Sequence, residues 1–457
     1  MVELRGKPLQ FLTFFGGSFS IMQCGFNLGW PTYALPYLLS NSSAIPVTND
    51  EGSWIASIHL LGGICGSILA AFTLDVLGRK TMLLAVLVFA SGIWLILAFA
   101  RSTLELLIAR FLAGICDGVA FPGAPLYLAE VSNPKIRGLL VNGTQVVYFF
   151  GIFLPNLLGV FLNIYTIAII SSVFALVGSF IYLFVPESPY FYLIKTNVDE
   201  AKSSLRKFTG GSSNEVENYL VLMQNTLNES SGGKWWNLFT DQINRKFVFL
   251  LIASRLFQMF SGYMGIVFYA QILFRETEIV NPAEFVSIFY LLQVAGMIVN
   301  SSMVDRVGRR PLIITSISSV TVALSILSVY FTLENVTEIN VSDYSWCPIV
   351  GLFMYIVCFS LGLQGIIFLL CNEVFPMHVK TYAVMGLGIL YNLFGSVVSK
   401  FFQYTKDEFG LHVPFIIFTL SSMCGIPFFI YFIPETKRKT LEEIQDQLRS
   451  KKKSNTT

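Results

Sequence analysis

Long apolar runs alternate with short polar segments along nearly the whole chain. About twelve of these runs are long enough to cross a hydrocarbon core of about 30 Å as helices. The first contains Gln23 and Asn27 and lacks a small-residue cleavage site, so we expect a retained helix rather than a signal peptide. The pattern predicts an all-α polytopic membrane protein. The runs lie near residues 11–33, 53–74, 81–100, 104–128, 139–162, 166–185, 247–274, 284–304, 311–331, 346–372, 381–404 and 413–433.

One long polar segment, residues 186–246, divides the apolar runs into two groups of six. Within it, residues 199–206 and 215–220 place apolar side chains at helical spacing, which predicts short surface helices. A disordered linker is the alternative, and the periodic Leu and Tyr positions disfavour it. The predicted organisation is an N-terminal six-helix bundle at 1–185, a cytoplasmic linker at 186–246, a C-terminal six-helix bundle at 247–436 and a tail at 437–457.

Composition agrees with a lipid environment. Hydrophobic residues make up 54% of the chain and charged residues only 13%, against roughly 25% charged residues in an ordinary soluble domain. The net charge of +2 is too small to indicate a nucleic-acid partner. The seven cysteines and three histidines lack the spacing of metal ligands, so no metal or cofactor is expected.

Lysine and arginine concentrate on alternate sides of the predicted spans. The segment 195–246 and the tail from Lys437 are basic. Because cytoplasmic loops of membrane proteins collect Lys and Arg, both termini are predicted to be cytoplasmic. Glycosylation sequons begin at Asn41, Asn335 and Asn340, on the predicted outer side.

Three charged signatures occur twice in the same order, at offsets of roughly 230 to 250 residues. Parallel repeats of membrane helices are typical of transporters, so we expect the site between the two halves. Glycine permits close backbone approach and arginine offers several donors to a carboxylate, which suggests a charge cluster that holds helix ends together. Charges that merely stop the helices are the alternative. The first copy contains Asp75, Gly78, Arg79, Glu130, Arg137 and Glu187, and the second contains Asp305, Gly308, Arg309, Glu373, Lys380 and Glu435.

Many side-chain amides lie within the apolar runs. Neutral amides suit an uncharged sugar, which needs hydrogen bonds without ion pairs. For any single amide, hydrogen bonding between helices is the commoner explanation. Two charges, Asp117 and Arg255, also lie inside runs, where each costs about 2.5 to 3.5 kcal/mol on insertion scales. Each is expected to find an opposite charge or cavity water. The amides are Gln23, Asn27, Asn142, Gln145, Asn156, Gln258, Gln293, Asn300, Gln364, Asn372 and Asn392.

Taken together, the motifs resemble those of sugar porters of the major facilitator superfamily. The specific elements are the paired Asp-x-x-Gly-Arg motifs, Arg137-Gly138 and the Pro-Glu-Ser-Pro of 186–189. The segments 29–31, 50–55 and 111–118 are most similar to the insect branch of facilitated trehalose transporter-like proteins. The resemblance implies two pseudo-symmetric six-helix bundles whose charge clusters link helix ends on the cytoplasmic side and separate when the site opens inward.

The resemblance also implies substrate-binding residues. Gln145 matches a sugar-contacting Gln of the fifth helix, and Gln258 matches the first Gln of the family's Gln-Gln-x-Ser-Gly-Ile-Asn element. Gln293 falls where an Asn is usual, and Asn392 falls where a Trp is common. Asn27 stands where proton-coupled relatives carry Asp, and an amide cannot titrate, so facilitated diffusion is favoured.

The chain departs from the family pattern at several positions. Met259 replaces the second Gln and Met264 replaces the sugar-binding Asn. If each lost group contributes about 0.5 to 1.5 kcal/mol net, ordinary hexose affinity falls by about one to two orders of magnitude. Phe368 stands where a Trp is common, and Tyr190 stands where the family usually has Arg.

The sequence therefore predicts facilitative uniport of a sugar, with trehalose or a hexose as candidates, across the plasma membrane. A proton-coupled symporter and a transport-deficient sensor or scaffold are the alternatives. A membrane enzyme is disfavoured because no acid–base pair, metal cluster or nucleophile stands out. An ion channel is disfavoured because no filter sequence repeats. The predicted partners are a small-molecule sugar and the lipid bilayer.

Overall fold

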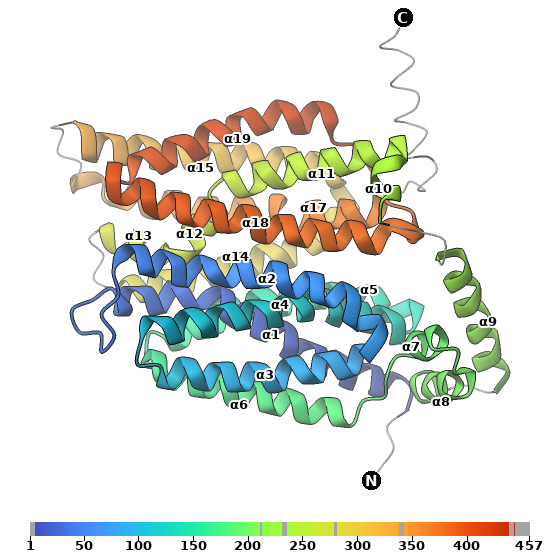
Figure 1. Cartoon of the computed structure of the whole chain (residues 1–457). Helices are drawn as coiled ribbons and strands as arrows, with labels where there is room; N and C mark the ends of the chain where they lie inside the picture. The colour runs from blue at the N-terminus through green and yellow to red at the C-terminus, as the bar shows by residue number, and fades with distance from the viewer. Residues whose placement is uncertain are drawn as a thin grey trace, which may run out of the picture. The chain divides into compact units, whose positions relative to one another are not determined.

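The computed structural model describes residues 5–210, 213–230, 235–277, 281–337, 342–437 and 443. The chain forms two compact units, Met1–Gly232 and Gly233–Thr457 (Figure 1). Each unit is helical throughout its described part, apart from turns and connecting segments.

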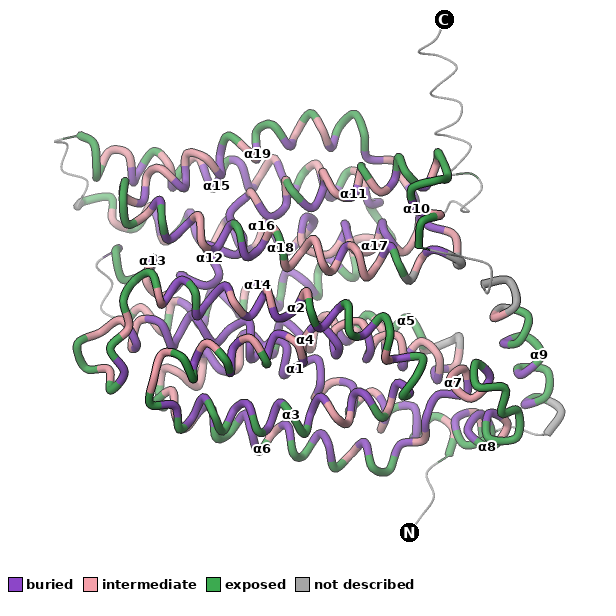
Figure 2. Tube along the Cα trace, in the orientation of Figure 1, coloured by how far each residue is buried: buried purple, intermediate pink, exposed green. Residues whose placement is uncertain are grey.

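Unit 1 contains six long helices followed by three short ones. α1 is the inner helix, packing against α5, α4 and α6, while α2 packs against α4. Figure 2 shows the consequence: α1 is largely buried, whereas α3 and α6 expose residues along their outer faces. The helices are α1 (Lys7–Leu38), α2 (Asn49–Leu77), α3 (Arg79–Phe99), α4 (Thr103–Val131), α5 (Pro134–Leu158), α6 (Ile164–Leu183), α7 (Pro189–Ile194), α8 (Val198–Thr209) and α9 (Ser213–Ser230).

Unit 2 contains helices that are interrupted at two places. α11 ends at Phe260, and α12 begins after Gly262, whose φ of 89° is favourable for glycine. α16 and α17 are separated at Leu361–Gly362. The helices are α10 (Asn237–Thr240), α11 (Gln242–Phe260), α12 (Tyr263–Phe268), α13 (Ala270–Glu276), α14 (Pro282–Val307), α15 (Arg309–Val336), the 3-10 helix η1 (Ser342–Tyr344), α16 (Trp346–Ser360), α17 (Leu363–Val374), α18 (Met377–Phe409) and α19 (His412–Phe432).

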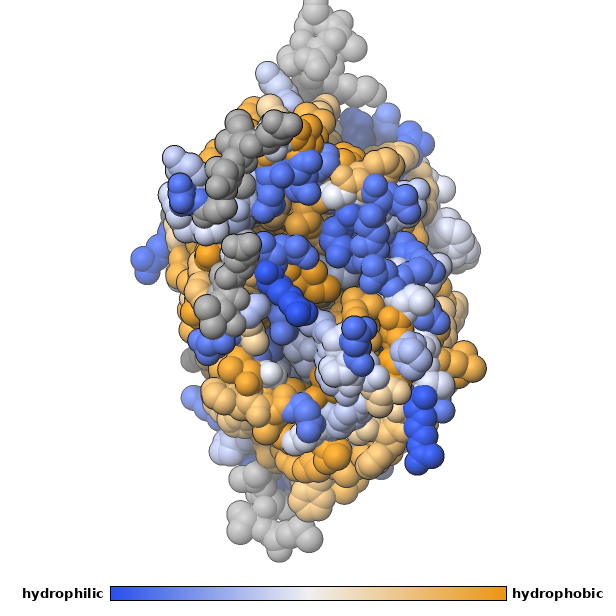
Figure 3. Space-filling view, turned by 90° about the vertical axis from the view of Figure 1, so that its left-hand side faces the viewer, coloured by the Kyte–Doolittle hydropathy of each residue, from blue (hydrophilic) through white to orange (hydrophobic). Residues whose placement is uncertain are grey.

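Each predicted apolar run coincides with one helix or with an interrupted helix. In the described part of the chain, ten spans are long and apolar enough to cross a membrane, and α1 and α4 are further helices of 32 and 29 residues. Large apolar side chains such as Phe72 and Phe89 are 72% and 67% exposed, as lipid-facing residues are. The end seen in Figure 3 carries many hydrophilic residues and is bordered by hydrophobic ones. The predicted all-α polytopic architecture is confirmed.

Small residues allow α2 and α4 to approach closely. A Cβ on Gly114 of α4 would lie 1.9 Å from the carbonyl oxygen of His59, and one on Gly62 would lie 2.1 Å from that of Phe111. Such contacts are typical of helix packing in membranes, where small residues let backbones touch. This packing also brings the side chains of His59 and Asp117 together.

Candidate functional site

The first charge cluster lies where α2 meets α3. The Arg79 guanidinium contacts Asp75 at 2.8 Å and Glu130 at 3.1 Å. Arg79 is buried, so these two carboxylates compensate its desolvation. Gly78 has φ 100°, a conformation that L side chains rarely adopt.

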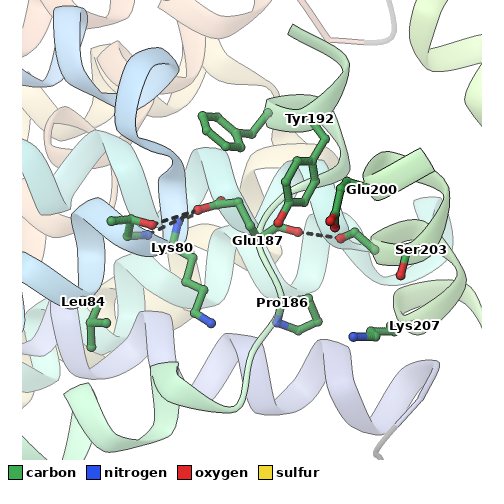
Figure 4. Close-up of a pocket in the computed structure, with 11 residues that line it drawn as sticks. Lys80, Leu84, Pro186, Glu187, Tyr192, Glu200, Ser203 and Lys207 are labelled. Atoms are coloured by element: carbon green, nitrogen blue, oxygen red, sulfur yellow. Dashed lines mark hydrogen bonds between the residues drawn. The ribbon is translucent and has the colours of Figure 1, made fainter. Parts of the chain in front are cut away.

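Glu187, which follows α6, completes this cluster (Figure 4). Its carboxylate accepts hydrogen bonds from the backbone N–H groups of Lys80 at 3.0 Å, Thr81 at 3.3 Å and Ser188 at 2.9 Å. Two of these donors belong to the first turn of α3, where an anion is favoured by the helix dipole. The Ser188 hydroxyl in turn donates to Glu130. The cluster therefore connects α2, α3, α4 and the segment after α6.

Unit 2 repeats this arrangement around Arg309. Arg309 contacts Glu373 at 2.7 Å and Asp305 at 3.0 Å. Gly308, with φ 109°, precedes α15. Thr436 donates to Glu373, as Ser188 does to Glu130.

Glu435 takes the place of Glu187 in the second cluster. It accepts from the backbone N–H groups of Arg309 and Arg310, both at 3.1 Å, and of Lys437 at 2.9 Å. Partial burial alone would raise the pKa of Glu435, but these backbone donors outweigh burial and hold it below the ordinary value.

Two members of the predicted clusters, Arg137 and Lys380, are not held by these ion pairs. Arg137 is exposed and Lys380 is half-buried. Neither forms an ion pair with any residue that the structure describes. The structure therefore brings ten of the twelve predicted residues into two separate clusters, five in each unit.

A cavity of about 450 Å³ lies beside Glu187 in unit 1 (Figure 4). Lys80 lines it from α3, Tyr192 from α7, and Glu200 and Lys207 from α8. Burial and the neighbouring carboxylates of Glu200 and Glu187 raise the pKa of the Tyr192 phenol. None of the predicted substrate-binding residues lines this cavity.

Asp117 is the centre of a polar cluster inside unit 1. Its carboxylate accepts a hydrogen bond from the Asn27 amide at 2.9 Å, and His59 Nε2 lies 2.8 Å from its other oxygen. The partner of Asp117 is thus a histidine, which supplies an opposite charge only when it is protonated. His59 is a lone histidine in an apolar run, so the sequence alone gave no reason to pair it with Asp117.

Arg110 is a second buried charge in unit 1 that sequence reasoning missed. Its guanidinium donates to the carbonyl oxygens of Asn27 at 2.8 Å and Ile55 at 3.3 Å, and lies 5.0 Å from the Trp30 ring centroid. Its position inside an apolar run was the available signal. Arg110 joins α1, α2 and α4 through their backbones.

Gln258 lies at the interrupted helix of unit 2. The side chain is buried, and its amide donates to the Leu363 carbonyl oxygen at 2.5 Å, next to the break between α16 and α17. Its carbonyl accepts from the Arg255 guanidinium. Gln258 therefore links α11 to α17 and also solvates a buried charge.

Gln293 is part of a neighbouring amide cluster. Its amide donates to the Tyr263 hydroxyl at 3.0 Å and to Gln364 Oε1 at 3.2 Å, and Gln364 donates to the same hydroxyl at 2.9 Å. The Gln293 carbonyl oxygen is buried without a hydrogen-bond partner among the described residues. Tyr263 had not been predicted, because a tyrosine in an apolar run does not stand out.

Asn392 and Gln145 are both half-buried. The Asn392 amide donates to the Gly388 carbonyl within its own helix at 3.1 Å. Gln145 makes no hydrogen bond to any residue in the described part of the chain. Asn27 and Gln145 belong to unit 1, and Gln258, Gln293 and Asn392 to unit 2.

The predicted glycosylation sites divide between described and undescribed residues. Asn41 and Asn335 are exposed, and Asn335 also donates to the Phe331 carbonyl at 2.9 Å. Asn340 lies outside the described residues.

Long apolar helices with hydrogen-bonded amides and buried charges inside them are typical of a multi-pass membrane protein with a functional polar interior. A family profile described as "Sugar (and other) transporter" matches residues 14–448. The chain therefore belongs to the sugar transporter family, as the sequence motifs predict.

Relatives and solved structures agree with this assignment. "Facilitated trehalose transporter Tret1" of Bombyx mori is 28% identical over 96% of this chain and 87% of its own length. "Trehalose transporter 1" of Drosophila melanogaster is 28% identical over 91% of this chain and 49% of its own length. These relatives are membrane carriers rather than enzymes, which confirms the prediction of a carrier.

Among solved structures, the inward-open xylose transporter XylE from E. coli has a TM-score of 0.76 at 20% identity, covering 96% of this chain and 99% of XylE. XylE bound to 6-bromo-6-deoxy-D-glucose, described as a major facilitator superfamily proton:xylose symporter, has a TM-score of 0.72 at 20% identity, covering 96% and 98%. At this identity the likeness concerns the fold alone. The predicted major facilitator fold is confirmed.

Proposed function

We propose that the chain carries a sugar across the plasma membrane by facilitative transport, through alternating access of its two units and with both termini in the cytoplasm. The observation that supports this most is the cluster formed by the buried residues Gln258, Gln293 and Tyr263 with the half-buried Gln364, in a chain of the sugar transporter family. Amide and hydroxyl groups in an apolar surrounding match the hydroxyl groups of a sugar. The trehalose transporters among its relatives make trehalose the first candidate.

Facilitation rather than proton coupling is supported by the environment of Asn27. An amide cannot exchange a proton at physiological pH, and Asn27 donates to Asp117. Asp117 is also engaged by His59, so its carboxylate has two partners within unit 1. We expect both charges of that pair to serve packing.

Proton-coupled symport is the second candidate function. The contact between His59 and Asp117 favours it, because both side chains are of ionisable types and lie within helices of the membrane domain. Uptake that is insensitive to external pH supports facilitation, whereas uptake that collapses with the proton gradient supports symport.

A transport-deficient sensor is a third candidate. Met259 and Met264 are both fully buried and offer no strong hydrogen bond to a sugar. A sensor would bind sugar without moving it.

The two charge clusters are proposed to hold the cytoplasmic ends of the helices within each bundle. Each connects two consecutive helices, a third helix and the segment after a fourth. Breaking these contacts would free the helix ends to move as the carrier opens inward.

A substrate panel tests the proposed function and its residues together. Trehalose, glucose, fructose and polyols are supplied to an expression host that lacks its own porters, with wild type compared with Gln258→Ala. We expect uptake of at least one sugar, and a loss of roughly tenfold or more in Gln258→Ala, since the variant leaves buried partners unpaired. Unchanged uptake in Gln258→Ala would show that the assigned residues are wrong even if the chain is a carrier.

A further inference from the structure

Arg255 is a buried cation inside unit 2 that has no carboxylate partner among the described residues. The side chain is 4% exposed and lies within the membrane span Gln242–Phe268. None of the ion pairs among the described residues includes Arg255. The sequence led us to expect an opposite charge or cavity water, and in the described part of the chain the opposite charge is absent.

The contacts that Arg255 does make are neutral. One guanidinium nitrogen donates to Gln258, and the group lies 5.2 Å from the centroid of the Tyr391 ring. Its Nε atom is buried and has no hydrogen-bond partner among the described residues. A guanidinium is a fixed cation with a planar fork of donors that matches a carboxylate. Arg255 therefore has both an uncompensated charge and an unused donor.

Asp117 and Arg79 show how this protein treats its other buried charges. Arg79 contacts two carboxylates, and Asp117 contacts His59 and Asn27. Arg110 of unit 1 is an exception, because it too contacts no carboxylate among the described residues, and it shares with Arg255 a buried guanidinium that donates only to neutral groups. A buried charge in a membrane span marks a functional position by default.

We propose that Arg255 binds the acidic group of the transported solute, so that the preferred substrates are sugars that carry a carboxylate, such as uronic or aldonic acids. A singly charged carboxylate neutralises one guanidinium, whereas a doubly charged phosphate would remain half uncompensated in a span that offers one cation. The sugar ring of such a solute would reach Gln364 and Asn392, whose half-buried amides lie on α17 and α18.

The surface of α18 beside Tyr391 is open at one position. A Cβ on Gly388, one turn before Tyr391, would meet no atom within 4 Å. Tyr391 and Asn392 are themselves half-buried rather than packed away. The donors of Arg255 are thus next to a stretch of α18 that leaves space open.

This inference rests on the proposed function, because it names the class of sugar that the carrier accepts. The test uses the full chain in proteoliposomes, with labelled glucuronate, gluconate, glucose, trehalose and glucose 6-phosphate. We expect glucuronate or gluconate to move, and to compete for transport at least about tenfold more strongly than glucose, as a buried charge pair implies.

Two variants of Arg255 separate its charge from its shape. We expect Arg255→Gln to weaken transport of the acidic sugar by about tenfold or more, while glucose transport changes by less than about threefold. Arg255→Lys keeps the charge but loses the planar fork, so its affinity for the acid should fall between those of wild type and Arg255→Gln. If Arg255→Gln does not fold, wild type is compared with Arg255→Lys alone. Arg245→Gln, on the exposed surface of the same helix, is the matched control and should behave as wild type.

Three results would overturn the proposal. Glucose or trehalose could move while the acids neither move nor compete, which would leave the carrier function standing. The Arg255→Gln variant could lose transport of neutral and acidic sugars to the same extent. The transport defect of Arg255→Gln could also be rescued by adding Asp117→Asn, which would show that Asp117 pairs with Arg255 during the transport cycle. If wild type neither binds nor moves any of the five solutes, the proposed function itself fails.

Discussion

At the scale of single residues, two glycines decide where the charge clusters can form. Gly78 and Gly308 both have a positive φ, and each lies directly against a glutamate. A Cβ on Gly78 would lie 2.3 Å from an oxygen of Glu187, and one on Gly308 would lie 2.7 Å from an oxygen of Glu435. Any larger residue therefore meets both backbone strain and a clash.

We expect Gly78→Ala and Gly308→Ala each to destabilise the protein by at least about 1 kcal/mol, because alanine avoids positive φ. The measurement is thermal unfolding in detergent. Gly92→Ala is the control: Gly92 lies inside α3, and a Cβ there would meet nothing within 4 Å. Its stability should be unchanged or higher by up to about 1 kcal/mol, since alanine favours helix. Equal melting temperatures for all three variants would show that the two clusters contribute nothing to stability.

Sequence reasoning succeeded at these residues because the motif is local and repeated. It failed at His59, Arg110 and Tyr263, whose partners lie on other helices. Nothing along the chain marks a lone histidine as the neighbour of Asp117, since only the packing of α2 against α4 brings them together. It expected an opposite charge or cavity water at Arg255 without choosing between them, because a contact between distant helices cannot be read from the spacing of one residue.

At the scale of secondary structure elements, the glutamates act as caps. Glu435, from the segment after α19, accepts hydrogen bonds from two backbone N–H groups in the first turn of α15. A carboxylate at this position is stabilised by the helix dipole as well as by the hydrogen bonds. These hydrogen bonds join two segments that lie more than a hundred residues apart in the sequence, the start of α15 and the segment after α19.

The lowered pKa of Glu435 predicts a pH dependence of stability. A carboxyl with a depressed folded-state pKa stabilises the protein above its ordinary pKa of about 4.3, and this contribution is lost as the pH falls through the folded-state value. Glu435→Gln should therefore melt at a lower temperature than wild type at pH 7, with a difference that shrinks below about pH 4.

Glu408→Gln is the matched control for this experiment, because Glu408 is exposed on α18. It should melt like wild type at every pH. A difference between wild type and Glu435→Gln that stays constant as the pH falls would contradict the capping role.

The sequence also anticipated most helices, because long apolar runs bounded by charge leave few alternatives in a membrane. The interruptions between α11 and α12 and between α16 and α17 were not anticipated. Gly262 and Gly362 lie within apolar runs, and the neighbouring sequence does not show whether the helix breaks at these glycines or continues through them. The Ser316 hydroxyl stabilises the second break by donating to Cys358 and accepting from Leu363.

At the scale of the whole molecule, the duplicated clusters relate the two units. Arg79 and Arg309 make equivalent contacts. Glu187 and Glu435 both accept backbone hydrogen bonds from the first turn of a helix, α3 and α15, with the donors shifted by one residue between the two units. The polar interiors differ: unit 1 holds the charges Arg110 and Asp117, whereas unit 2 holds amides and Arg255. The architecture is thus repeated while the chemistry is divided between the units.

Counterflow in proteoliposomes tests the account most directly, because only a carrier that exposes one site alternately to the two sides exchanges solute across the membrane. Vesicles that contain the full chain are loaded with unlabelled sugar and diluted into labelled sugar, with and without a proton gradient. We predict transient accumulation of the label that is independent of the gradient. Binding of the sugar without counterflow would contradict the account.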